Sequence, residues 1–149
     1  MKLKENNCNF KLSLLGETFT KNSEIFEKAK LIFAEEIINF GFVSSKNEYF
    51  SILQSSHVVV STAKHEFFGV SMMEATYYGC FPLAPNGLVY PEIYPKESLY
   101  SDIDDLYKKL QRFCVNPSMA IELRNNLNID FSKYSLEQSL PEFYDILNE

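Results

Sequence analysis

Two glutamates around a short aromatic and glycine segment are the residues whose types and spacing could do chemistry. Seven residues separate Glu66 from Glu74, and Phe68-Gly69-Val70 lies between them. The surrounding pattern predicts a helix from about Phe68 to Tyr78, which would place the two backbones about 10 Å apart along its axis. That separation suits one extended polar ligand, and it differs from paired carboxylates that face each other across a single bond.

The residues between the glutamates favour an anionic ligand. A helix that begins near Phe68 presents the free N–H groups of Phe68, Gly69 and Val70, together with the positive end of its dipole, to a phosphate. Gly69 has no side chain, so a diphosphate could approach the backbone closely. A carboxylate such as that of Glu74 also suits a cis-diol, because its two oxygens can accept two hydroxyl donors. The segment therefore predicts a nucleotide-binding pocket.

Simpler interpretations exist for each of these residues alone. Glu66 could only complement the helix dipole, and Glu74 could be a solvated helix residue. His65 is a candidate base, because histidine as a residue type suits acid–base chemistry near neutral pH, although an orienting role is the favoured interpretation. Lys64 could reach a phosphate or remain solvated. Cys80 is expected to be a small buried hydrophobe, not a nucleophile. The combination of both glutamates with Gly69 favours the pocket.

Short apolar runs alternate with amphipathic stretches along the chain, which is typical of strands and helices in turn. Strands are expected over residues 10–15, 40–43, 57–61 and 80–84, and helices over 24–38 (capped by Asn22 or Ser23), 48–54, 68–78, 102–113, 117–127 and 136–147. The two prolines of residues 90–95 predict a rigid loop.

This alternation predicts an α/β fold, Rossmann-like and doubly wound, with a mostly parallel sheet in one domain over residues 1–149. Ligands of such sheets lie outside the carboxyl ends of the strands. The segment from Thr62 to Phe68 follows the strand at 57–61 and so falls in that place. The sheet is expected to position the two glutamates at a ligand-binding edge.

Composition narrows the possible partners. The formal charge of −6 and the pI near 5.0 argue against nucleic-acid binding by this chain, because such binding needs a basic face. The three cysteines, Cys8, Cys80 and Cys114, have no CxxC spacing, so neither a disulfide framework nor a metal site is expected. No apolar run is long enough for a membrane span. A soluble, cytoplasmic setting is expected.

The spacing from Glu66 to Glu74, with Phe68-Gly69-Val70 inside it, resembles the E-x7-E signature of the retaining glycosyltransferases of family 4, or group 1, which have the two-domain GT-B fold. Further segments resemble the C-terminal domain of that fold: residues 10–16 its second strand, 41–43 a turn that borders the base, and 91–93 a segment after a later strand. More narrowly, residues 61–70, 79–83 and 88–93 are similar to glycosyltransferases that mannosylate queuosine in tRNA.

The resemblance implies a role for each matching residue. Glu66 would contact hydroxyls of the donor sugar, and Glu74 would accept hydrogen bonds from the ribose diol. The backbone of Phe68, Gly69 and Val70 would meet the sugar and the diphosphate. Phe42 and Val43 would border the base.

The reaction that the resemblance implies retains the anomeric configuration and needs no metal or other cofactor, and the departing diphosphate assists the acceptor. The expected donor is GDP-mannose, with a UDP-sugar as the alternative. The acceptor would be tRNA queuosine, bound only through the full-length enzyme. Two alternatives stay open: a donor domain that serves a cell-envelope polysaccharide or lipid acceptor, and a non-catalytic nucleotide-binding module.

One part of the family pattern has no match. The Arg and Lys that neutralise the diphosphate in this family belong to the unit upstream of Phe10, and neither Lys2 nor Lys4 has the corresponding context. The first βα unit of the domain and the N-terminal acceptor domain are therefore expected to be missing from this chain. Weak donor binding without turnover is the expectation for the chain alone.

Overall fold

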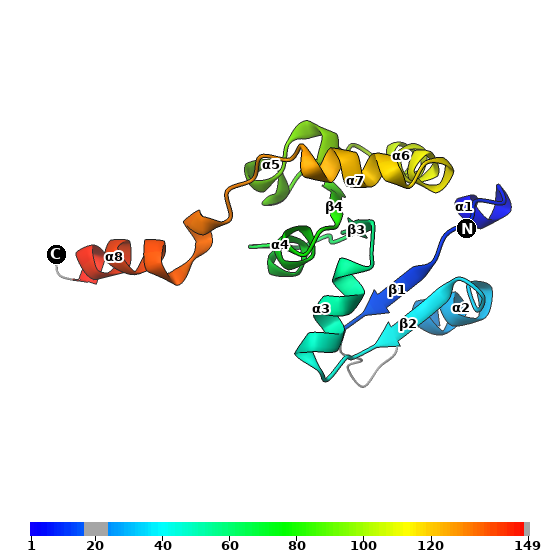
Figure 1. Cartoon of the computed structure of the whole chain (residues 1–149), viewed down its shortest axis with the longest axis horizontal. Helices are drawn as coiled ribbons and strands as arrows, with labels where there is room; N and C mark the ends of the chain where they lie inside the picture. The colour runs from blue at the N-terminus through cyan, green and yellow to red at the C-terminus, as the bar shows by residue number, and fades with distance from the viewer. Residues whose placement is uncertain (17–23, 148–149) are drawn as a thin grey trace.

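The computed structural model describes residues 1–16 and 24–147, so the expected caps Asn22 and Ser23 lie outside the described residues. Short strands alternate with helices along the chain (Figure 1). The elements are α1 (Lys2–Glu5), β1 (Leu12–Leu15), α2 (Glu24–Ile32), β2 (Ile37–Gly41), α3 (Lys46–Gln54), β3 (Val58–Val60), α4 (Val70–Tyr77), β4 (Phe81–Pro85), α5 (Tyr90–Ile93), η1 (Lys96–Ser98), β5 (Leu99–Tyr100), α6 (Ile103–Val115), α7 (Ser118–Asn125), η2 (Ser132–Tyr134) and α8 (Leu136–Leu147).

Every described strand pairing is parallel, which confirms the α/β class. β1 pairs with β2, and β3, β4 and β5 form a second sheet in that order. In the doubly wound order the first strand lies between the second and the fourth. If β1 and β2 are the second and third strands, the break between β1 and β3 falls at the position of the first. The parallel strands and alternating helices are those of a Rossmann-like C-terminal half of a GT-B fold.

β4 is the centre of the core. Phe81, Leu83 and Ala84 are fully buried, as expected for a parallel strand covered on both faces. The packing partners differ between the faces: Phe81 and Leu83 pack in a cluster with α6 and α7, whereas Ala84 packs in a cluster with α4 and α5. β1 and β2, by contrast, contain no buried residue. The region beside the break is therefore less covered than the region around β4.

The second strand begins earlier than expected. The helix predicted over residues 24–38 ends at Ile32, and the strand predicted over residues 40–43 is β2, Ile37–Gly41. The apolar residues at 37 and 38 fit the helical pattern as well as a strand, so periodicity alone could not separate the two. Parallel pairing with β1 makes residues 37–41 a strand. The Asn39 side chain of β2 also donates a hydrogen bond to Ser13 Oγ of β1 at 2.9 Å.

The remaining boundaries lie close to expectation. α3 begins two residues earlier than predicted because Ser45 Oγ accepts the backbone N–H of Glu48 at 3.3 Å and caps the helix. The segment expected to be a rigid loop at residues 90–95 contains the short helix α5. β5 and α1 were not predicted. The last helix, α8, has the predicted bounds of 136–147 and extends away from the sheets (Figure 1).

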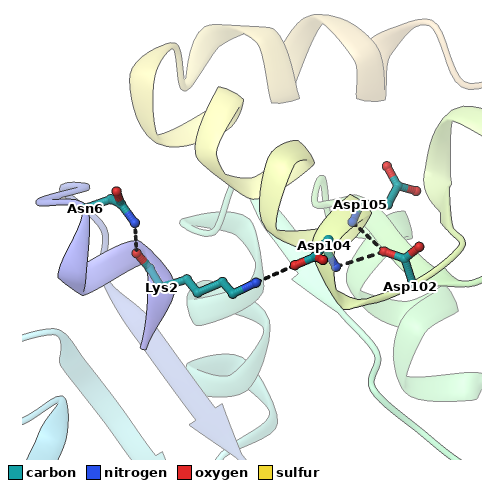
Figure 2. A network of polar contacts seen from close by, with 5 residues as sticks. All are labelled: Lys2, Asn6, Asp102, Asp104 and Asp105. Carbon is teal, nitrogen blue, oxygen red and sulfur yellow. Dashed lines mark hydrogen bonds and ion pairs between the residues drawn. The ribbon is translucent and has the colours of Figure 1, made fainter.

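α1 makes polar contacts to α6 on one side and to the residue before β2 on the other. Lys2 Nζ pairs with Asp104 near the start of α6, whereas Lys4 Nζ donates to Glu36 Oε2 at 2.9 Å, next to β2. Figure 2 shows the α6 end of this network, where Asp102 Oδ1 accepts the backbone N–H groups of Asp104 at 2.9 Å and Asp105 at 2.8 Å. The aspartate cap explains the start of α6, because it satisfies two N–H groups of the first turn.

Candidate functional site

The predicted pocket segment connects β3 to α4. α4 begins at Val70, two residues later than expected, and Gly69 is its N-cap residue with φ 75° and ψ 30°. This is the left-handed region, which L side chains rarely adopt. A Cβ at Gly69 would also lie 3.2 Å from Cε1 of Tyr90. Gly69 is thus required by backbone conformation and by the Tyr90 ring, independently of any ligand.

Glu66 turns back onto the start of α4. Its Oε1 accepts the backbone N–H of Phe67 at 3.0 Å and of Phe68 at 3.2 Å. The N–H groups of Gly69, Phe68 and Phe67 lower the pKa of Glu66 below its ordinary value. The carboxylate of Glu66 therefore lies at two of the N–H groups that were predicted to receive a phosphate, those of Phe68 and Gly69.

Glu74 lies on the exposed side of α4 and contacts the neighbouring helix. The hydroxyl of Tyr49 in α3 donates to Glu74 Oε2 at 3.3 Å. Among the described residues the structure records no hydrogen bond to the other carboxylate oxygen of Glu74. Glu66 thus lies in the loop four residues before α4 begins, whereas Glu74 lies about one turn into that helix.

Three residues that the sequence analysis did not single out form hydrogen bonds at the start of the loop between β3 and α4. The hydroxyls of Tyr90 and Ser61 share a hydrogen bond of 2.7 Å, and Tyr100 donates to the backbone oxygen of Ser61 at 2.8 Å. Tyr90 is buried, and burial raises the pKa of its hydroxyl. The sequence signals for Tyr90 were its place in the block at residues 88–93, which carries part of the family resemblance, and in the loop predicted over residues 90–95.

The other candidate residues flank these groups. Lys64 and His65 are exposed, and the structure records no hydrogen bond or ion pair for either side chain within the described residues. Phe42 is exposed and Val43 is half-buried, both in the segment between β2 and α3. Cys80 is buried as expected, and its burial raises the pKa of the thiol to about 11.

No group of three or more His, Cys, Asp or Glu side chains within residues 1–16 and 24–147 could hold a metal ion.

An open cleft with a volume of about 320 Å³ lies apart from the predicted pocket, and neither Glu66 nor Glu74 lines it. Its lining residues come from α4, α7 and the segment up to η2: Thr76, Tyr77, Arg124, Leu127, Ile129, Phe131 and Ser132. Across the described part of the chain, no helix combines the length and the apolar character that crossing a membrane requires.

Comparison with known proteins defines the class. Residues 1–130 match the family of glycosyl transferases group 1, and the chain belongs to that family. The chain is also 41% identical over 149 residues to the tRNA-queuosine alpha-mannosyltransferase of Drosophila melanogaster. This match covers 99% of the chain and 39% of that relative, so the chain spans about two fifths of the relative's length. The resemblance inferred from residues 61–93 is confirmed at both levels.

Proposed function

We propose that this chain is the donor-binding domain of a retaining glycosyltransferase that transfers mannose from GDP-mannose to queuosine in tRNA. The observation that carries the proposal is the turn at the start of α4, where the left-handed Gly69 exposes N–H groups already in contact with the Glu66 carboxylate. The similarity to a tRNA-queuosine alpha-mannosyltransferase supports the choice of sugar and acceptor.

In the proposed complex the diphosphate takes the place of the Glu66 carboxylate at the backbone of Phe68, Gly69 and Val70. Glu66, released from these N–H groups, contacts hydroxyls of the donor sugar. Glu74 accepts hydrogen bonds from the ribose diol. Phe42 and Val43 border the base, and His65 orients neighbouring groups without acting as a base.

The proposed reaction needs no metal. The bond between the anomeric carbon and the diphosphate oxygen breaks, and the acceptor oxygen bonds to the same face of that carbon. The proton of the acceptor hydroxyl passes to the departing diphosphate. The contribution of this domain is to hold the donor and to direct N–H groups at the negative charge that develops on the leaving group.

The break in the sheet explains why the pocket of this chain is incomplete under this proposal. In a parallel sheet the loops after neighbouring strands lie at the same edge. A strand between β1 and β3 would therefore bring its following loop beside residues 61–69, and this is where the diphosphate-neutralising Arg and Lys of the family belong. Without them two charge-assisted hydrogen bonds are lost, each worth about 1.5 to 3 kcal/mol. We therefore propose that this chain binds the donor weakly. Turnover would need the first βα unit and the acceptor domain as well.

The acidic charge also bears on the acceptor. A net charge of −6 repels the tRNA phosphates and provides no basic face. We therefore propose that tRNA contacts reside in the acceptor domain, which belongs to the part of the enzyme outside this two-fifths segment.

Nuclear magnetic resonance titrations of the chain with GDP, UDP and GDP-mannose test the proposal, because they reach millimolar affinities. The guanosine nucleotides should bind more tightly than UDP, and the shifted resonances should lie in residues 42–43 and 61–74. Binding of UDP-sugars without binding of GDP would remove the support for mannose transfer to queuosine. Mannose transfer to tRNA by this chain alone would contradict its proposed incompetence.

The assignment of Glu74 to the diol has its own test. Glu74→Gln should weaken GDP binding by about 1 to 3 kcal/mol, since a hydrogen bond to a charged group is lost. Glu122→Gln is the matched control, because Glu122 is an exposed glutamate on the surface of α7. Equal affinities of the two variants would show that Glu74 does not contact the nucleotide.

A further inference from the structure

We propose that Tyr49 is a positioning residue for ribose recognition, and that it acts by holding the Glu74 carboxylate in place. The inference rests on the proposed role of Glu74 at the ribose diol. Its basis is the hydrogen bond of 3.3 Å from the Tyr49 hydroxyl in α3 to Glu74 Oε2 in α4, two residues that are 25 positions apart in sequence. No sequence pattern pointed to Tyr49.

Packing between α3 and α4 sets the geometry of this contact. The Phe50 ring of α3 stacks on Tyr78 at the end of α4, with centroids 4.3 Å apart and an interplanar angle of 19°. The Cys80 thiol donates to the backbone oxygen of Leu53 at 3.2 Å and ties the end of α3 to the start of β4. These contacts fix the separation of the two helices on the side that carries Tyr49.

Tyr49 itself is held in a half-buried place. Its side chain packs against the buried cluster of Leu53, Ala75 and Cys80, and its ring lies 5.7 Å from that of Phe50. Tyrosine has few rotatable bonds, and packing of this ring removes much of the remaining freedom. The hydroxyl is therefore directed at Glu74 by a rigid support.

The direction of the hydrogen bond follows from charge. Partial burial raises the pKa of the Tyr49 hydroxyl, and the Glu74 charge and the hydrogen bond to it raise that pKa further. The phenol accordingly stays protonated at neutral pH and acts as the donor to the carboxylate.

This donor matters because an exposed glutamate on a helix samples several rotamers. A fixed donor at Oε2 selects one of them, while the carboxylate keeps acceptor capacity for two further hydroxyls. Tyr49 would thereby preorganise Glu74 for a cis-diol, which lowers the entropic cost of ordering the carboxylate when the nucleotide binds.

A comparison of GDP with 2′,3′-dideoxy-GDP tests the inference, since the second nucleotide lacks the diol. The wild-type chain should prefer GDP. Tyr49→Phe should reduce that preference about 2- to 12-fold, the range expected for one typical intramolecular hydrogen bond, and should leave the affinity for the dideoxy nucleotide unchanged. Glu74→Gln should abolish the preference. Tyr77→Phe is the control, because it removes an exposed phenol from α4.

The possible failures are distinct. If Glu74→Gln loses the preference while Tyr49→Phe keeps it in full, the inference about Tyr49 is wrong and the proposed function stands. If Tyr49→Phe weakens both nucleotides equally, Tyr49 is structural and the inference is again wrong. If the wild-type chain shows no preference, or binds neither nucleotide at millimolar concentration, the proposed function fails and the inference fails with it.

Discussion

The carboxylate of Glu66 accepts the backbone N–H of Phe68 at 3.2 Å, so a side chain of the loop lies where the proposed diphosphate would bind. Donor binding then requires Glu66 to leave these N–H groups, and the same charge would become free for the sugar hydroxyls. The free chain and the proposed complex thus use one carboxylate in two ways.

Glu66→Gln should change the pH dependence of stability. The N–H groups of Gly69, Phe68 and Phe67 lower the pKa of Glu66, so its ionised form stabilises the fold above about pH 5. This stabilisation is lost as the pH falls through the lowered pKa. Calorimetry should therefore show a lower Tm for the variant at neutral pH and a difference that shrinks as the pH falls below the ordinary pKa of a glutamate. A difference independent of pH would contradict the prediction.

Gly69→Ala should destabilise the chain by about 1 to 2 kcal/mol, because alanine is strained in the left-handed region and its Cβ would crowd Tyr90 at 3.2 Å. Gly87→Ala is the matched control, since a Cβ at Gly87 meets nothing within 4 Å. Urea denaturation of both variants measures the difference in the free energy of unfolding. Similar values for the two would show that Gly69 is not conformationally required.

Tyr90→Phe should cost about 1 kcal/mol or somewhat more, since Ser61 Oγ loses its hydrogen bond of 2.7 Å in a half-buried place. The same variant should weaken GDP binding, because Ser61 begins the loop that leads to Gly69. Tyr77→Phe, at an exposed tyrosine, should change neither quantity. Thermal denaturation and the GDP titration check both effects, and an unaltered Tm for Tyr90→Phe would exclude a supporting role.

Cys80 should resist alkylation in the native state. Its thiol is buried and donates to the backbone oxygen of Leu53, and burial raises its pKa to about 11. Because the thiolate is the reactive form, iodoacetamide at about pH 8 should modify Cys80 only after unfolding. Peptide mass spectrometry with and without urea measures this. Cys8 is half-buried and is the internal comparison; equal native rates for the two would contradict the described packing.

Asp102→Ala should lower the Tm by about 2 to 4 °C, the effect expected of a lost helix cap in a chain of this size. Asp102→Asn keeps an acceptor for the N–H groups of Asp104 and Asp105 and should lower it less (Figure 2). Lys2→Ala removes an exposed ion pair to Asp104 and should have little effect. Equal losses for Lys2→Ala and Asp102→Ala would show that the cap is not the stabilising element.

Several features followed from the sequence because they depend on neighbouring residues. The alternation of apolar runs predicted the α/β class, and the spacing of Glu66, Gly69 and Glu74 predicted one helix start with two carboxylates, which the structure contains. The bounds of α8 also agree with prediction. Patterns of this kind are local: a period of two or 3.6 residues, or a cap three residues away, is visible along the chain itself.

Other features depended on contacts between distant residues, and these only the tertiary structure decided. β2 begins at Ile37 because of its pairing with β1, Gly69 meets the Tyr90 ring, and Tyr49 reaches Glu74 across 25 residues. The break between β1 and β3 likewise became visible only in the strand pairing. The physical reason is common to all four: a propensity is a property of a segment, whereas pairing, close approach and hydrogen bonding between helices are properties of two surfaces that the folded chain brings together.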